Sequence, residues 1–145
     1  MKKLSFLAGK WSGEARIFRG SAAPVEMAQT ETAEYKLDGL ILTIEGIGRN
    51  KLDGKPVLQA FGVLSYDDEA GTYRMRAFND GRWLETEMKL AESGKELTWG
   101  FAFGDVKTSS VLRINEKGEW TELHEITIGP QPAQKFMELK VSPKN

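Results

Sequence analysis

Residues 72–91, TYRMRAFNDGRWLETEMKLA, decide the fold of this chain. Apolar and polar side chains alternate along both halves of the stretch, as they do in half-buried β-strands. The halves meet at Asp80-Gly81, a pair that favours the tight type I′ turn because glycine adopts a positive φ freely and aspartate tolerates it. The stretch therefore predicts two antiparallel strands joined by a hairpin.

The same pattern continues in both directions along the chain, where glycine-containing turns separate further alternating runs. Too few residues lie between these runs for the crossover helices that parallel strands need. The one helical segment that we expect is a short turn over residues 2–8. The predicted strands are 11–19, 25–37, 40–51, 57–66, 72–79, 82–91, 96–103, 106–115, 119–128 and 134–142.

Hairpin-linked strands in this number predict an all-β fold, a single antiparallel up-and-down β-barrel of about ten strands. Curling the sheet until its first and last strands meet removes the exposed edges of a flat sheet. A two-sheet sandwich is the structural alternative, but the chain lacks the long crossover of a Greek key. We expect one domain over residues 1–145, whose interior is filled by side chains or shared with one small ligand.

Composition excludes several classes of function. Lys and Arg number 20 against 21 Asp and Glu, for a net charge of −1, which argues against a nucleic-acid partner. The absence of cysteine removes disulfide scaffolds, thiol nucleophiles and cysteine zinc sites. With His124 as the single histidine, a His-rich metal centre is excluded as well. Monomer and homodimer both remain open.

The start of the chain bears on where the protein acts. Two lysines and a few apolar residues imitate a signal peptide, but Lys10 interrupts the apolar run before it reaches the usual length of a leader. No other run is long enough to span a bilayer as a helix. We therefore expect a cytoplasmic protein, or a periplasmic or secreted one if a leader has been removed.

A family resemblance rests on a few short segments. Residues 6–13, FLAGKWSG, resemble the opening of calycin barrels, the superfamily of lipocalins, fatty-acid-binding proteins and nitrobindin-like haem barrels. Residues 61–67, FGVLSYD, and 118–122, GEWTE, are most similar to a family of uncharacterised bacterial lipocalin-like proteins. The resemblance implies a calycin barrel with Trp11 closing its floor. The nitrobindin resemblance implies haem ligation by a histidine, here His124, although the motif around that residue differs.

Polar residues on apolar strand faces indicate a wet interior. Glu122 and His124 share the alternation phase of the apolar residues on their strand, and Gln29 and Glu31 do so on theirs. An unpaired polar group in a filled core costs several kcal/mol, whereas a cavity uses a few such groups to orient a ligand. The alternative is a β-bulge that turns Glu122 and His124 outward.

Three further patterns complete the prediction. Trp99 and Phe101 lie on one phase of a central strand, where we expect a ligand wall, although aromatic residues in most strands simply pack the core. Arg74 and Arg76 occupy the less apolar phase of their strand and are expected to face solvent. Residues 46–48, Gly-Ile-Gly, lack the strand–loop–helix setting of a phosphate loop.

The leading hypothesis is a non-catalytic barrel that holds a small hydrophobic or amphipathic molecule. Trp99 and Phe101 would supply the apolar wall, and Gln29, Glu31, Glu122 and His124 would fix the polar end. One alternative is an enzyme that uses Glu122 or His124 as acid or base in the same cavity. The others are a haem barrel ligated by His124, with no other cofactor expected, and a filled barrel that acts through a protein partner.

Overall fold

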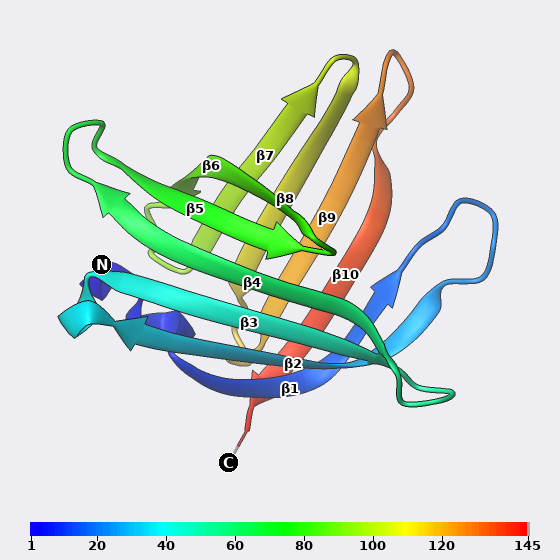
Figure 1. The fold of residues 1–145 in the computed structure, drawn as a ribbon, viewed down its shortest axis with the longest axis horizontal. Coiled ribbons are helices and arrows are strands. Elements are labelled where there is room, and N and C mark those ends of the chain that lie inside the picture. Colours follow the sequence, from blue (N-terminus) through cyan, green and yellow to red (C-terminus); the bar gives the residue numbers. More distant parts are fainter. Residues whose placement is uncertain (145) are drawn as a thin grey trace.

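The chain forms a closed barrel in which each strand pairs antiparallel with its neighbours in sequence, as the computed structural model, which describes residues 1–144, shows (Figure 1). The all-β up-and-down barrel predicted from the sequence is confirmed. Within the described residues, no helix is long and apolar enough to cross a membrane. The elements are η1 (Lys2–Leu7), β1 (Gly9–Ile17), β2 (Val25–Lys36), η2 (Leu37–Gly39), β3 (Ile41–Asn50), β4 (Pro56–Asp67), β5 (Thr72–Asn79), β6 (Arg82–Leu90), β7 (Glu96–Phe103), β8 (Val106–Ile114), β9 (Trp120–Ile128) and β10 (Gln134–Pro143).

The barrel closes where β1 meets β10. The pairing runs from Trp11 opposite Pro143 to Ile17 opposite Met137. A Cβ atom on Gly13 would collide with the backbone carbonyl of Lys140. Glycine at this position therefore lets the two terminal strands approach closely enough to pair.

One end of the barrel is filled by apolar side chains. Leu4 and Leu7 of the 3-10 turn η1 are fully buried there. The indole N–H of Trp11 donates a hydrogen bond to the carbonyl of Leu7 at 2.9 Å. The Trp11 ring packs edge-on against Trp120 with 5.4 Å between ring centroids. Trp11 is thus a buried structural residue that ties η1 to the wall at this end of the barrel.

The wall is continuous except between β6 and β7. Only two residue pairs join these strands, Lys89 with Thr98 and Leu90 with Leu97, and Figure 1 shows β6 turning away from β7. Farther along, the hydroxyl of Thr86 donates to the carbonyl of Gly100 at 3.1 Å. A side-chain contact therefore takes the place of part of the missing backbone ladder.

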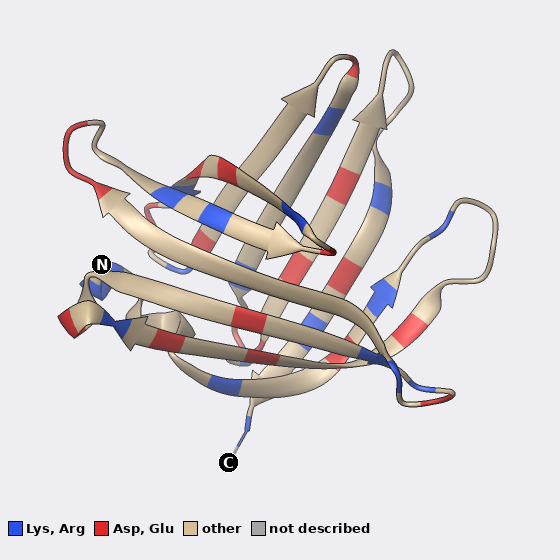
Figure 2. Ribbon diagram, in the orientation of Figure 1, with Lys and Arg blue, Asp and Glu red and all other residues tan. Residues whose placement is uncertain are grey.

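Charged residues are spread over the strands and turns of the barrel (Figure 2), and most of their side chains are exposed or partly exposed. Arg74 lies 2.8 Å from Asp67 and 3.6 Å from Glu87, and Arg76 lies 3.1 Å from Glu85. All of these side chains are at least partly exposed. The two arginines face solvent, as their alternation phase predicted, and leave the interior to other groups.

Candidate functional site

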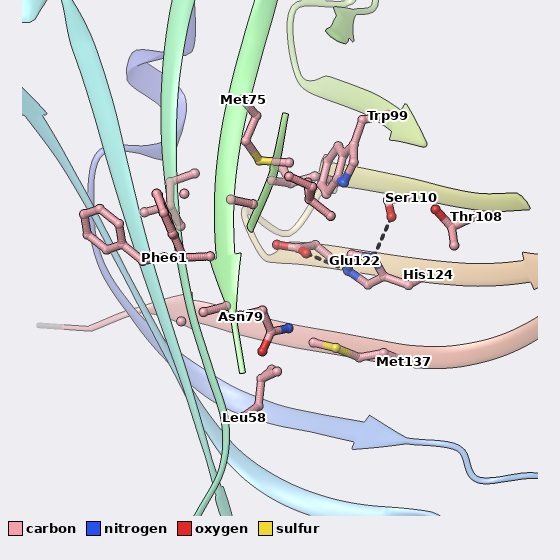
Figure 3. A pocket seen from close by; sticks show the side chains of 18 of the residues that line it. Leu58, Phe61, Met75, Asn79, Trp99, Thr108, Ser110, Glu122, His124 and Met137 are labelled. Carbon is pink, nitrogen blue, oxygen red and sulfur yellow. Dashed lines mark hydrogen bonds and ion pairs between the residues drawn. The ribbon is translucent and has the colours of Figure 1, made fainter. Parts of the chain in front are cut away.

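The interior of the barrel is hollow. A cavity of about 620 Å³ lies inside it, a volume typical of small-molecule sites. Strands β2 to β10 all contribute to its lining, and most of the contributing side chains are apolar (Figure 3). The larger apolar side chains of the lining are Ile44, Leu58, Phe61, Leu64, Met75, Phe78, Leu84, Met88, Trp99, Phe101, Leu112, Phe136, Met137 and Leu139.

A chain of hydrogen-bonded polar groups crosses one side of this cavity. Ser110 Oγ lies 2.7 Å from His124 Nδ1, and His124 Nε2 lies 2.8 Å from Glu122 Oε1 (Figure 3). The indole N–H of Trp120 donates to the other oxygen of Glu122 at 2.7 Å. The carboxyl of Glu122 therefore has a partner on each oxygen and is held in one orientation.

The register of β8 and β9 builds this chain. Alternation places Trp120, Glu122 and His124 on one face of β9, and the pairing sets Ser110 directly opposite His124. No register shift interrupts β8 and β9, so the alternative of a bulge turning Glu122 and His124 outward is wrong. The irregularity lies instead in β10, between Lys135 and Met137, where Phe136 and Met137 both line the cavity.

The hydrogen bonds assign roles to the two ring nitrogens of His124. In a neutral imidazole one nitrogen donates and the other accepts. The arrangement suits a neutral imidazole that donates its Nε2 proton to Glu122 and accepts the hydroxyl proton of Ser110 at Nδ1. The hydroxyl oxygen of Ser110 is left with lone pairs on the cavity lining.

A second polar pair comes from β2. Glu31 and Gln29 are only 5% and 1% exposed, and Gln29 Nε2 donates to Glu31 Oε1 at 3.0 Å. Within residues 1–144, Gln29 Oε1 has no hydrogen-bond partner. Burial raises the pKa of Glu31 well above its ordinary value, the carboxyl of Glu122 raises it further, and the bond from Gln29 lowers it.

Two glycines on β3 make room for these side chains. Gly46 pairs with Glu31 and Gly48 with Gln29 across the β2–β3 ladder. A Cβ on Gly46 would lie 2.7 Å from Glu31 Oε2, and one on Gly48 would lie 2.7 Å from Gln29 Oε1. The Gly-Ile-Gly segment at residues 46–48 is therefore part of a strand and not a phosphate loop. Its two glycines leave the space that the Glu31 and Gln29 side chains occupy.

The structure brings most of the predicted site residues to one cavity. Glu31, Trp99, Phe101, Glu122 and His124 line it, whereas Gln29 is hidden beside Glu31 and does not. The Trp99 and Phe136 rings flank the imidazole of His124, with 5.9 and 5.7 Å between ring centroids. Sequence reasoning missed Ser110, Thr108, Asn79, Met75 and Phe136.

The residues present do not fit the haem alternative. A haem iron takes a free ring nitrogen of its axial histidine, but both nitrogens of His124 are engaged by Ser110 and Glu122. Within residues 1–144, no group of three or more His, Cys, Asp or Glu side chains is arranged to hold a metal ion.

The fold is similar to that of a solved protein. The crystal structure of Rv2717c from M. tuberculosis matches with a TM-score of 0.73 and 17% sequence identity, over 99% of this chain and 96% of that one. No protein-family model matches this chain. A search of curated proteins finds no match either. The likeness extends to the fold, and the chemistry of the cavity has to be argued from this chain's own residues.

Proposed function

We propose that this protein binds a small amphipathic molecule inside the barrel. The observation that carries the proposal is a cavity of about 620 Å³ whose mostly apolar lining contains one polar region. The apolar part of the guest would lie against Trp99, Phe101 and Met75. Its polar end would lie at Glu31 and at the hydrogen-bonded chain of Ser110, His124 and Glu122.

The burial of polar groups on the cavity lining supports this proposal. Placing polar groups in an interior costs free energy unless each finds a partner. Glu31 lines the cavity. Among the described residues, one hydrogen bond reaches its carboxyl group, from Gln29 to Oε1. A guest that supplies the missing partner would relieve this cost, and an apolar tail would add the gain from leaving water.

We also propose that the barrel is a calycin, akin to the uncharacterised bacterial lipocalin-like proteins. The Gly9-x-Trp11-x-Gly13 segment supports this proposal, because Trp11 closes the floor and Gly13 admits the last strand.

The experiment is a titration with Nile red, an uncharged apolar dye whose fluorescence rises in apolar surroundings, together with native mass spectrometry of the purified protein. Ala77 lines the cavity, so Ala77→Phe should fill part of it and weaken dye binding by about tenfold. Ala102→Phe makes the same change at an exposed position and should leave binding unchanged. Absence of any guest or dye binding would refute the proposal.

A second candidate is an acyl hydrolase, favoured by the order hydroxyl, imidazole, carboxylate along Ser110, His124 and Glu122. This order suits a hydroxyl nucleophile, a base and a group that orients the base. An apolar p-nitrophenyl ester and a fluorophosphonate probe test it. Hydrolysis and labelling that vanish in Ser110→Ala, while Nile red still binds, would establish this activity. Labelling that survives in the variant would exclude Ser110 as the nucleophile.

A further inference from the structure

The charges that line the cavity are unevenly distributed. Glu31, Glu122 and His124 lie on its lining, and they are buried or nearly so. Among the described residues, the single arginine or lysine of the lining is Arg82, which is exposed beside the β5–β6 turn. A buried arginine is the side chain best suited to pair with a carboxylate guest, and within residues 1–144 this lining has none. This interior offers acceptors instead.

Glu31 is a buried carboxyl group with one oxygen that has no protein partner among the described residues. Glu31 is only 5% exposed, and its side chain lines the cavity. Gln29 donates to Oε1, and within residues 1–144 no hydrogen bond or ion pair reaches Oε2. The strands on either side of β2 place Trp11 and Gly46 opposite it, and neither brings a charge. Glu122 on β9 is the charged group that acts on Glu31.

We infer that the polar end of the guest is a protonated amine, which binds between the carboxyl groups of Glu31 and Glu122. This inference rests on the proposed function and names the head group of its ligand. An ammonium carries three N–H donors and no acceptor, so it supplies Glu31 Oε2 with a charge-assisted hydrogen bond. A carboxylate guest would meet two carboxyl groups and no buried arginine or lysine, and an alcohol would supply one uncharged donor.

The protonation of Glu31 gives the binding step a second signature. Burial and Glu122 raise the pKa of Glu31 in the empty protein. A bound cation favours the ionised carboxyl and lowers that pKa again. Binding of an amine therefore releases a proton at any pH where Glu31 is partly protonated, which calorimetry in buffers of different ionisation enthalpy measures.

The test compares decylamine, decanol and decanoate, which share one apolar chain, as competitors for bound Nile red. We expect decylamine to displace the dye at a concentration about tenfold lower than decanol, with decanoate weakest. Glu31→Gln keeps the size of the side chain. It should lower the ratio between the displacing concentrations of decanol and decylamine by about tenfold. Glu34→Gln changes the same residue type on the outer face of β2 and should leave the advantage intact.

The outcomes separate the head group from the function. If decanol or decanoate competes as well as decylamine, the amine inference is overturned while ligand binding stands. If the amine keeps its advantage in Glu31→Gln, the assignment to Glu31 is wrong; decanol binding by that variant shows that it is folded. If Nile red and all three competitors fail to bind, the proposed function falls and the inference falls with it.

Discussion

Replacing Glu31 by glutamine should stabilise the empty protein at neutral pH. The pKa of Glu31 is raised in the folded state, chiefly by burial, so above the ordinary carboxyl value of 4.5 the folded protein binds more protons than the unfolded chain. Stability therefore falls as pH rises from that value through the folded pKa. For one proton the loss is at most about 1.4 kcal/mol per pH unit. The substitution abolishes this loss.

The assay is urea unfolding of both proteins at a series of pH values from about 4 to 8. The difference in the free energy of unfolding between the two proteins should be constant at the acidic end and should rise with pH wherever Glu31 is ionised in the unfolded chain and protonated in the folded protein. For a chain of this length, each kcal/mol corresponds to about 2–4 °C in Tm. The other titrating groups are the same in both proteins, so their contributions cancel in the difference between the two free energies of unfolding. Parallel stability curves at all pH values would refute the reasoning.

Three other substitutions test the architecture. Ser110→Ala leaves His124 Nδ1 without its donor and should cost about 1–2 kcal/mol in urea unfolding. Glu122 should keep the imidazole proton on Nε2, so nitrogen NMR should show the same tautomer in both proteins. Gly13→Ala places a methyl group against the Lys140 carbonyl and should open the β1–β10 junction. Hydrogen exchange should show lost amide protection there, and unfolding should show a destabilisation of at least about 3 kcal/mol; a variant as stable as the parent would contradict this. Trp11→Phe deletes an indole donor and packing at the floor and should cost about 2–4 kcal/mol in thermal unfolding, whereas an unchanged Tm would deny it a structural role.

Most of the barrel could be predicted from local pattern. The predicted strands 72–79 and 96–103 coincide with β5 and β7, because glycine turns bound both ends of each strand. The prediction for 11–19 differs from β1, which begins at Gly9 and ends at Ile17. There the end of the strand depends on pairing with β2, since Gly9 pairs with Ala33, and alternation within β1 carries no information on its partner.

The site was less accessible to sequence reasoning. Alternation indicates which face of a strand a side chain occupies, which is how Glu122 and His124 were placed inside. It gives no signal for Ser110, because a serine is equally at home on an outer face; the β8–β9 register was needed to set it opposite His124. For the same reason, alternation places Gln29 inside the barrel but does not show that it lies beside Glu31 and off the cavity lining. Phe136 depends on a bulge in β10 that no glycine marks.

The sparse pairing between β6 and β7 makes this the weakest junction in the barrel wall. Separating β6 from β7 disrupts two paired residues on each strand, whereas separating β7 from β8 disrupts eight. Local opening takes place where the fewest hydrogen bonds are lost. If the barrel holds a guest, we therefore expect local separation of β6 from β7, beside Thr86 and Gly100, to expose it while the β1–β10 pairing stays intact.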